Sequence, residues 1–513
     1  MTLELLRTLV APAVGILALG CLGPNPLLDA GGDGTDDATD DTSEVGDGDG
    51  DGDGDDDTDA GDGDTGDGDG DDDPCSNGVL DGDETDVDCG GSCPACDDGS
   101  ACAAETDCAS QVCAGSVCQA PSCEDQIQNG DEVGVDCGGS ACGFCQFSQF
   151  WPELDDYQAT PASFPQVAMF ADHSFAITYA GPTNARARWF NELGNATGPS
   201  VELSDTISFV GGRVLPLVAG VGDDHPIHAL VAGTDPMSTS TDLFLIRRTH
   251  AAELTKFRIN AISQVVGFGG LTVNGSKATL SWQANTNQVL TRRLDYTVDA
   301  GSWTDISPFD AETEPGQFTG WSPNMARNSA GMTVVAWIRG GPTFDLAIRR
   351  FDGGWVDPAP VTAGDLSPDY AASNPRVAIA EDGRVAVAWT LVGPDVSGFG
   401  AWILDADLVP EGPSWILQPV VLPGGGTLGD VAALDDGSFA FVWPDNSQKR
   451  VHLRRFLSAD TPKLTEVGDE APWGVLGNSL ASASIANVDG RAVVVWSGTA
   501  DGVAQIQGQV LSY

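Results

Sequence analysis

Short amphipathic strands that end in an aromatic or large apolar residue recur over residues 146–513. The ends of these strands are Tyr179, Leu230, Trp282, Trp337, Trp389, Trp443 and Trp496. Successive ends are 51, 52, 55, 52, 54 and 53 residues apart. A near-constant period of this length is typical of repeat architectures, in which each repeat is one supersecondary unit that packs against its neighbours.

Each repeat has the same internal plan. A first strand leads into a tight two-residue turn, and four repeats place glycine second in this turn, at 274–275, 382–383, 436–437 and 489–490. Asn-Gly and Asp-Gly are favoured because both central residues of such hairpins take positive φ. The second strand then alternates in size: Val385, Val387 and Trp389 share one face, and Ala386 and Ala388 share the other. Large and small faces of this kind suit sheets that stack closely.

A third strand and a weaker fourth strand follow, as at 346–352 and 414–422. Four antiparallel strands in about 50 residues, repeated seven times, predict an all-β fold with a seven-bladed β-propeller over residues 146–513. Tandem β-sandwiches are the alternative, but about 53 residues are too few for one such domain. The last repeat stops after its third strand at Tyr513, so residues 147–158 are predicted to complete the last blade.

The distribution of charge separates a second region from the repeats. The chain carries 23 Lys and Arg against 76 Asp and Glu, a formal net charge of −53. Residues 29–73 hold 22 acidic residues, no basic residue and long Asp-Gly runs. With almost nothing apolar to bury, residues 21–74 are predicted to be a disordered acidic linker. Nucleic acid is excluded as a partner, because its affinity for proteins comes mainly from Lys and Arg on phosphates.

The first residues predict export. Residues 8–20 form an apolar run of thirteen residues, which is the length of a signal-peptide core and too short for a transmembrane helix. The run ends in Ala18-Leu19-Gly20-Cys21, which resembles the lipobox of bacterial lipoproteins. This resemblance implies a signal peptide over 1–20, lipidation of Cys21, and a membrane partner bound through the lipid anchor. Leu22, in place of Asp, implies the outer membrane or cell surface by the same analogy. The alternative is an ordinary secretory signal.

Twelve of the thirteen cysteines lie within residues 75–145, and the thirteenth is Cys21. The twelve are Cys75, Cys89, Cys93, Cys96, Cys102, Cys108, Cys113, Cys118, Cys123, Cys137, Cys142 and Cys145. An even number at this density predicts a disulfide-rich module made in an oxidising compartment, with a connectivity that the sequence does not specify. Zinc binding by the Cys-x-x-Cys pairs is the alternative, and the lack of histidine in the module favours disulfides.

Two segments of this module are copies of each other. Residues 75–96 read CSNGVLDGDETDVDCGGSCPAC, and residues 123–145 read CEDQIQNGDEVGVDCGGSACGFC. They resemble the NGDET-DVDCGG cysteine repeats of large secreted myxobacterial proteins, and the likeness covers the 71 residues 75–145. The resemblance is specific in cysteine spacing and implies no particular function.

Aligned oxygen-bearing side chains in the two copies are candidate ligands for calcium. They are Asp81, Asp83, Glu84 and Asp88 in the first copy and Asn129, Asp131, Glu132 and Asp136 in the second. Carboxylates clustered around a glycine-containing turn are the ligands that Ca²⁺ prefers. The alternative is a solvated acidic turn. No cofactor is expected to be required, and Ca²⁺ is the candidate metal for these side chains.

The repeats contain no linear catalytic motif: nucleophile elbows, phosphate-binding loops and zinc-protease helices are all missing. We therefore predict a protein that is not an enzyme, whose propeller binds an extracellular or surface glycan or protein through loops that converge at one end. Two alternatives stay open. One is a secreted polysaccharide hydrolase or lyase that uses acidic residues of the propeller channel, and the other is a purely structural envelope component.

Overall fold

The computed structural model describes residues 73–513, with gaps at 140–141, 151–162, 181–183, 205–206, 221–223, 235–240, 252–253, 260–268, 284–288, 298–301, 306–311, 314–319, 340–344, 352–355, 358–360, 363–370, 393–396, 413–414, 421–427, 446–449, 457–461, 468–481 and 501–502. The predicted signal peptide, Cys21 and the predicted linker up to residue 72 lie outside the described residues. Within the described part of the chain, no helix is long and apolar enough to cross a lipid bilayer.

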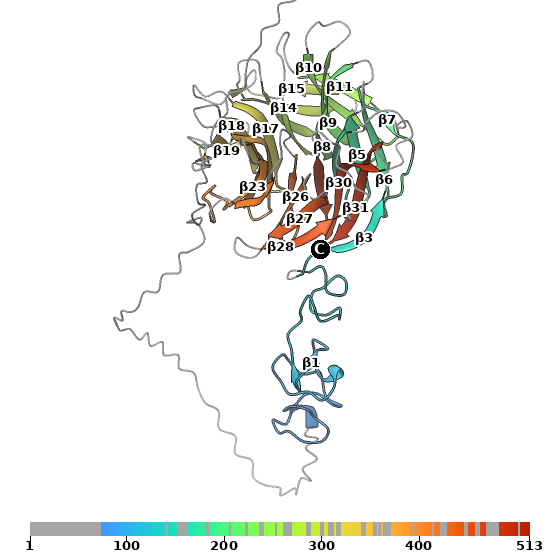
Figure 1. Cartoon of the computed structure of the whole chain (residues 1–513), viewed down its shortest axis with the longest axis vertical. Coiled ribbons are helices and arrows are strands. Elements are labelled where there is room, and N and C mark those ends of the chain that lie inside the picture. The colour runs from blue at the N-terminus through green and yellow to red at the C-terminus, as the bar shows by residue number, and fades with distance from the viewer. Residues whose placement is uncertain are drawn as a thin grey trace, which may run out of the picture. The chain divides into compact units, whose positions relative to one another are not determined.

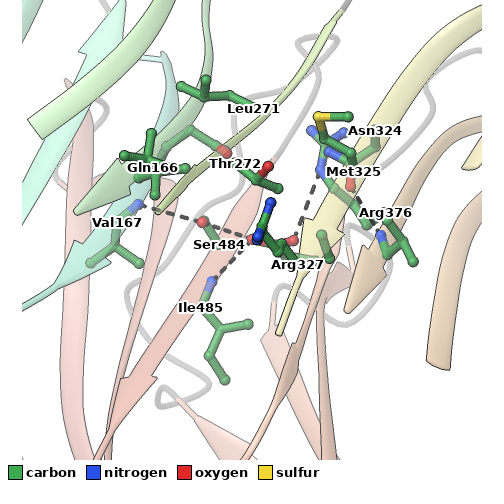
Figure 2. Close-up of a pocket in the computed structure, with 15 residues that line it drawn as sticks. Gln166, Val167, Leu271, Thr272, Asn324, Met325, Arg327, Arg376, Ser484 and Ile485 are labelled. Carbon is green, nitrogen blue, oxygen red and sulfur yellow. Dashed lines mark hydrogen bonds and ion pairs between the residues drawn. The ribbon is translucent and has the colours of Figure 1, made fainter. Parts of the chain in front are cut away.

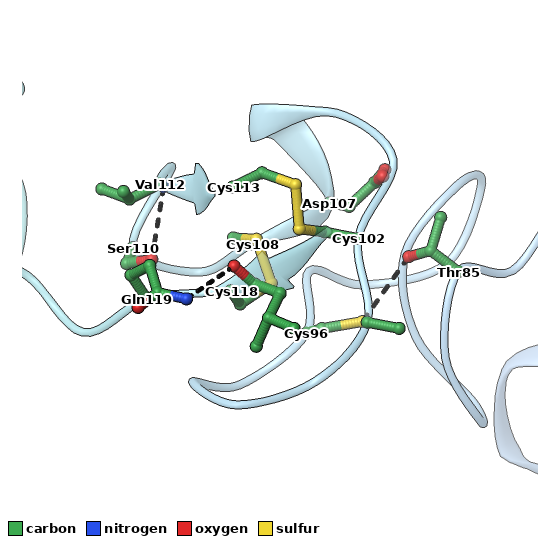
Figure 3. The surroundings of a disulfide bond; sticks show 12 residues. Thr85, Cys96, Cys102, Asp107, Cys108, Ser110, Val112, Cys113, Cys118 and Gln119 are labelled. Carbon is green, nitrogen blue, oxygen red and sulfur yellow. Dashed lines mark hydrogen bonds between the residues drawn. A yellow bond between two sulfur atoms is a disulfide. The ribbon is translucent and has the colours of Figure 1, made fainter. Parts of the chain in front are cut away.

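Three tandem groups of four cysteines make up the disulfide-rich part of the chain. Its elements are η1 (Pro74–Ser76), η2 (Glu105–Asp107), β1 (Cys113–Ala114) and β2 (Val117–Cys118). The disulfides are Cys75–Cys93, Cys89–Cys96, Cys102–Cys113, Cys108–Cys118, Cys123–Cys142 and Cys137–Cys145. Every group therefore pairs its first cysteine with its third and its second with its fourth. The predicted disulfides are confirmed, and Figure 3 shows the middle group.

The Gly-Gly pair after the second cysteine of each copy is required by the local backbone. Gly90 and Gly91 have φ angles of 78° and 59°, a left-handed conformation that is unfavourable for residues with a side chain. Cβ atoms added there would lie 1.9 Å from Thr85 Oγ1 and 2.1 Å from the carbonyl oxygen of Asp83. The loop can therefore fold back on itself only with glycine at both positions.

The rest of the described chain is all-β and forms seven antiparallel sheets. Sheet 1 contains β4 (Ser163–Met169), β5 (Phe175–Ala180), β6 (Ala185–Phe190) and β7 (Val201–Glu202). Sheet 2 contains β8 (Ser208–Ala219), β9 (Ile227–Thr234), β10 (Thr241–Arg248) and β11 (Leu254–Arg258). Sheet 3 contains β12 (Gly269–Asn274), β13 (Lys277–Gln283), β14 (Val289–Thr297), β15 (Ser302–Asp305) and β16 (Glu312–Thr313). Sheet 4 contains β17 (Gly320–Arg327), β18 (Thr333–Arg339), β19 (Asp345–Phe351) and β20 (Val361–Thr362).

Sheets 5 to 7 repeat this order of strands. Sheet 5 contains β21 (Ala371–Ile379), β22 (Val385–Val392), β23 (Ser397–Leu404) and β24 (Trp415–Val420). Sheet 6 contains β25 (Asp430–Ala433), β26 (Phe439–Asp445), β27 (Arg450–Phe456) and β28 (Pro462–Val467). Sheet 7 contains β29 (Ala483–Val488), β30 (Arg491–Ala500), β31 (Val503–Ser512) and β3 (Cys145–Phe150).

Sheet 7 combines strands from opposite ends of the repeat region. β3 precedes the first repeat in sequence and pairs antiparallel with β31, with Gln149 opposite Gln509. Figure 1 shows the two strands next to each other close to the C-terminus. The prediction that residues 147–158 complete the last sheet is confirmed for residues 147–150, and the strand begins two residues earlier than predicted, at Cys145. Residues 151–158 lie outside the described residues.

Large and small faces meet between successive sheets. Val387 and Trp389 of β22 pack against sheet 4, whereas Ala386 and Ala388 on the opposite face pack against sheet 6, which contributes Trp443. Hydrophobic cores join every successive pair of sheets, and one of them joins sheet 7 to sheet 1. The arrangement is propeller-like, with the sheets grouped around a common centre (Figure 1).

Arg455 of β27 links sheet 6 to the end of the disulfide-rich part. Its side chain is buried and donates to the carbonyl oxygens of Gly139 and Cys142 at 2.8 and 3.1 Å. It also donates to Ser438 Oγ at 3.0 Å and forms an ion pair with Asp436. A buried guanidinium needs several acceptors, and Arg455 has them from both parts of the chain. We therefore assign Arg455 a structural role.

His228 of β9 is buried, and its Nδ1 has no hydrogen-bond partner among the described residues. Burial, together with Arg247, lowers the pKa of His228 to about 3. In an unfolded chain the pKa of histidine is about 6.5, so between these values the unfolded state binds more protons and stability falls as the pH falls. We expect acidification from pH 7 to pH 5 to lower the free energy of unfolding by about 2 kcal/mol through this group, and His228→Gln to abolish that part.

Thermal unfolding of wild type and His228→Gln between pH 4 and pH 7 tests this expectation. His250→Gln is the matched control, because His250 is exposed. Equal acid sensitivity of wild type and His228→Gln would show that His228 does not carry the effect.

Candidate functional site in the central cavity

A cavity of about 260 Å³ lies among the first strands of the seven sheets, here called the inner strands. They are β4, β8, β12, β17, β21, β25 and β29. Each inner strand contributes lining residues, from Gln166 in sheet 1 to Ser484 in sheet 7, and Figure 2 shows their side chains. At roughly 30 Å³ per molecule the cavity has the volume of about eight or nine waters, which is room for a small polar ligand.

Equivalent positions of the inner strands form a polar belt around this cavity. The second strand of each sheet contains the aromatic or large apolar residue that marks the repeat. In each inner strand one residue pairs with the residue just before this repeat-marking residue. These residues are Gln166, Leu217, Gly270, Asn324, Arg376, Asp430 and Ser484. The polar belt consists of the five polar ones, Gln166, Asn324, Arg376, Asp430 and Ser484, all of which line the cavity. They belong to consecutive sheets, 4 to 7 and then 1, so the polar part of the cavity is continuous.

Bulged backbone precedes three of the belt residues. In β4, β17 and β21 the belt residue follows a proline, and the residue before that proline has positive φ, namely Phe164 (55°), Ser322 (53°) and Asn374 (49°). A register shift in the strand pairing marks each bulge. Bulges redirect side chains, and strained non-glycine backbone is concentrated at functional sites. The tripeptides Phe-Pro-Gln, Ser-Pro-Asn and Asn-Pro-Arg are the sequence signal that a search for linear catalytic motifs missed.

Belt side chains also satisfy backbone N–H groups of the next inner strand. Each belt side chain accepts from a backbone N–H group of the neighbouring sheet, and this N–H group belongs to the residue directly after the belt residue of that sheet. The three bonds run from Val377 N to Asn324 Oδ1 (3.0 Å), from Ile485 N to Asp430 Oδ2 (3.3 Å) and from Val167 N to Ser484 Oγ (3.4 Å). An inner strand has one edge without a partner strand, and its buried N–H groups need other acceptors. The belt therefore stabilises contacts between sheets as well as lining the cavity.

Arg376 departs from this pattern, because a guanidinium cannot accept a hydrogen bond. Its Nε lies 3.9 Å from Asp430 Oδ1 instead. Asp430 also accepts from its neighbour Val431 N at 3.0 Å and from Ser484 Oγ at 2.8 Å. Burial raises the pKa of Asp430 above its ordinary value, and the charge of Arg376 opposes this rise. Sheets 5 and 6 are thus joined at the cavity by a largely buried ion pair.

Arg327 is a second cation in the cavity and lies outside the belt. It follows Asn324 by three residues in β17. The residues at the corresponding place in β4, β12, β21 and β25 are apolar: Met169, Val273, Ile379 and Ala433. The Nε of Arg327 is buried without a hydrogen-bond partner among the described residues. Thr272 Oγ1 of β12 is likewise buried and without a partner in the described part of the chain, and this residue is 7% exposed.

The side chains predicted to bind calcium have hydrogen-bonding roles in the disulfide-rich part. Six of these carboxylates accept a hydrogen bond. Asp81 accepts from Asn77 Nδ2, Asp83 from Ser92 Oγ, Glu84 from Asp81 N, Asp88 from Gly78 N, Glu132 from Asn129 N and Asp136 from Gln126 N. Asn129 is buried and donates to the carbonyl oxygen of Ser110 at 2.7 Å. Asp131 lies against Gly139, where an added Cβ would be 2.5 Å from its carbonyl oxygen.

Three groups of potential metal ligands converge within the described residues, and each contains cysteines. They are Cys102 with Cys108 and Cys118, Cys75 with Glu84 and Cys93, and Cys123 with Glu132 and Cys142. All of these cysteines are in disulfides, and it is the thiolate that binds metals. The structure thus places Glu84 and Glu132 beside disulfides, and calcium binding stays a prediction.

Comparisons with known proteins concern the fold. No protein-family model matches the chain, and no curated protein matches its sequence. Similar solved structures include polysaccharide lyase Uly1, at 10% identity over 68% of this chain and 89% of that one, with a TM-score of 0.44. Penicillium chrysogenum α-L-arabinanase with arabinobiose matches at 12% identity over 59% and 94% of the chains, with a TM-score of 0.38. Trypanosoma rangeli sialidase with the inhibitor DANA matches at 11% identity over 61% and 56%, with a TM-score of 0.37.

The prediction that the protein is not an enzyme is contradicted by this comparison, since these solved structures are those of enzymes. At 10 to 12% identity the likeness assigns neither a substrate nor a reaction to this chain. The prediction depended on the lack of a linear motif. That reasoning fails for physical reasons, because the cavity takes only a few residues from each sheet and no continuous segment contains its site.

The ion pair in the cavity makes a testable contribution to stability. Asp430→Ala leaves Arg376 without its counter-ion and deprives Ser484 Oγ and Ile485 N of their acceptor. We expect the free energy of unfolding to fall by about 2–4 kcal/mol. Adding Arg376→Leu removes the unpaired charge and should restore part of that loss. Denaturant unfolding of the full chain measures both variants, and a double variant no more stable than Asp430→Ala would contradict the pairing.

Proposed function

We propose that the central cavity is the functional site and that the protein binds and cleaves a polysaccharide there. The observation that carries the proposal is the polar belt, in which five polar side chains at one repeat position converge on one cavity. A saccharide needs both donors and acceptors, and the amides of Gln166 and Asn324 and the hydroxyl of Ser484 supply both. Leu271 and Val218, from sheets 3 and 2, supply an apolar surface for the C–H groups of a sugar ring.

In this proposal the seven sheets are the blades of a closed seven-bladed β-propeller over residues 146–513, and the cavity lies on its axis. Two contacts support closure. A hydrophobic core joins sheets 7 and 1, and Val167 N of sheet 1 donates to Ser484 Oγ of sheet 7. Completion of sheet 7 by β3 gives the last blade its fourth strand. Residues 75–145 form a separate disulfide-rich domain ahead of the propeller.

Asp430 is the group that we propose for proton transfer during cleavage. It is the carboxyl that lines the cavity among the described residues, and burial raises its pKa. A carboxyl whose pKa is displaced toward neutrality exchanges protons more effectively at neutral pH. The hydroxyl of Ser484 lines the same cavity and donates to Asp430 at 2.8 Å, which offers a proton path between the carboxyl and a bound sugar.

We propose that the protein works outside the cytoplasm, anchored at the outer membrane or cell surface by lipid on Cys21. Six disulfides within residues 75–145 support export, because structural disulfides persist in oxidising compartments. The acidic segment of residues 21–74 then acts as a solvated, self-repelling spacer between the anchor and the folded part. Extracellular polysaccharides are accessible to a protein held in this way.

Cleavage is tested with the full chain and a panel of polysaccharides, using product analysis by chromatography and mass spectrometry. Wild type should bind and shorten at least one of them. Asp430→Asn should retain binding within a few-fold and lose at least about 10²-fold in turnover, because an amide cannot exchange the proton. Asp382→Asn, at an exposed carboxylate of the 382–383 turn, is the matched control and should keep both properties.

Two results would count against the proposal. Binding of a polysaccharide by wild type without any product would show that the protein binds but does not cleave it. Unchanged turnover by Asp430→Asn, with the same melting temperature as wild type, would remove Asp430 from the reaction.

The lipid anchor is tested at Cys21. Cys21→Ser cannot be acylated on sulfur, so the variant should move from the membrane fraction to the soluble fraction and lose incorporation of labelled fatty acid. Fractionation and metabolic labelling in a bacterial host measure both effects. A Cys21→Ser protein that stays in the membrane fraction would indicate a different form of attachment.

A further inference from the structure

We infer that the cavity is specific for a sugar that bears a carboxylate, such as a hexuronic acid residue, and that Arg327 recognises this carboxylate. The inference rests on the proposed function and names its substrate class. It starts from the fact that Arg327 has no counter-ion or acceptor among the described residues.

The repeats supply an internal comparison for Arg327. At the same place in four other inner strands the chain has Met169, Val273, Ile379 and Ala433, so the fold does not need a cation at this position. A guanidinium whose Nε is buried without an acceptor is destabilising. A negatively charged group on the ligand offsets that cost, because it restores both a counter-charge and hydrogen-bond acceptors.

The other charges of the cavity do not compete for this ligand. Arg376 and Asp430 pair with each other, so their formal charges cancel. Arg327 then leaves the cavity lining with a net formal charge of +1. The chain as a whole carries a formal net charge of −53. Its other acidic groups act only weakly on a ligand in the cavity, because distance and salt screen their charges. The local field in the cavity therefore favours a single anionic group.

Two further donors belong to the same side of the cavity. Thr272 Oγ1 is buried without a partner in the described part of the chain. Asn324 uses Oδ1 to accept from Val377 N, which leaves its Nδ2 as a donor. β12 and β17, which carry these residues and Arg327, approach so closely that a Cβ on Gly270 would lie 2.6 Å from Met325 N. Figure 2 shows the labelled side chains of both strands at the cavity.

This donor set matches a carboxylate. A guanidinium forms two parallel hydrogen bonds to the two oxygens of a planar carboxylate, and the amide of Asn324 and the hydroxyl of Thr272 line the same cavity as further donors for the ligand. The belt residues Gln166 and Ser484, on the opposite sheets, are then left for hydroxyl groups of the same sugar. In this inference the residues that recognise the carboxylate belong to sheets 3 and 4, and the residue proposed for proton transfer, Asp430, belongs to sheet 6.

The test uses the full chain and matched pairs of saccharides that differ only in charge. Oligomers of galacturonic, glucuronic and mannuronic acid are compared with their methyl esters by calorimetry, alongside dextran and dextran sulfate. Wild type should bind at least one acid about tenfold or more tightly than its ester. Arg327→Gln should remove that preference and leave binding of the ester within a few-fold. Arg327→Lys should retain part of the preference, because lysine keeps the charge and loses the bidentate geometry.

Two control variants keep the test decisive. Thr272→Val preserves shape and should weaken binding of the acid several-fold more than binding of its ester, even if Arg327→Gln proves unstable. Arg491→Gln, which removes a partly exposed arginine of sheet 7 away from the cavity lining, should behave as wild type. Equal affinity for an acid and its ester, or preference for dextran sulfate, would overturn the inference and leave the proposed function standing. Failure to bind any saccharide would overturn the proposed function itself, and the inference with it.

Discussion

The packing of the large face of one sheet against the small face of the next is the constraint on which the rest of this structure depends. In β22 the face with Val387 and Trp389 is buried against sheet 4, while the alanine face leaves room for Trp443 of sheet 6. Burying a side chain of this size contributes about 1.5–3 kcal/mol, and a register slip of one residue would exchange the two faces. A hydrophobic core lies between each pair of successive sheets, so these cores determine where each inner strand lies and bring five of the seven equivalent residues to one cavity.

The inner strands create a second requirement, because each has an edge without a partner strand. Polar side chains at the belt position meet this requirement when they accept from the next strand, as Asn324, Asp430 and Ser484 do. A polar belt therefore has a structural role in addition to the functional role that we propose for it. The part of the polar lining that the fold does not use points further, to a charged ligand. Arg376 is explained by Asp430, whereas Arg327 and Thr272 have no such explanation within the described residues.

The sequence allowed the sheets to be predicted but not the site. Strands that end at Trp337, Trp389 and Trp443 recur at a near-constant spacing and share a local pattern of large and small residues. Such a local pattern can be recognised in the sequence without knowledge of the fold. The number of cysteines predicted disulfides, but their pairing depends on which loops meet in space. The belt depends on strand register, and Gln166 and Ser484 are more than 300 residues apart in sequence although they line one cavity. The absence of a linear motif was for the same reason no evidence against an enzyme.

A chain built from repeats allows equivalent positions to be compared with one another, because each position of the repeat occurs in several sheets of the same chain. Arginines that the fold uses have partners: Arg455 bonds two carbonyl oxygens of the disulfide-rich part, and Arg350 pairs with Asp357. Arg327 stands where four of the other sheets have apolar residues, and its Nε lacks a hydrogen-bond partner among the described residues. A ligand that brings a negative charge would compensate the unpaired guanidinium of Arg327. The rest of the cavity lining consists of the Arg376–Asp430 pair and of hydroxyl, amide and apolar groups, which suit a sugar, so an anionic sugar is the ligand that we propose for it.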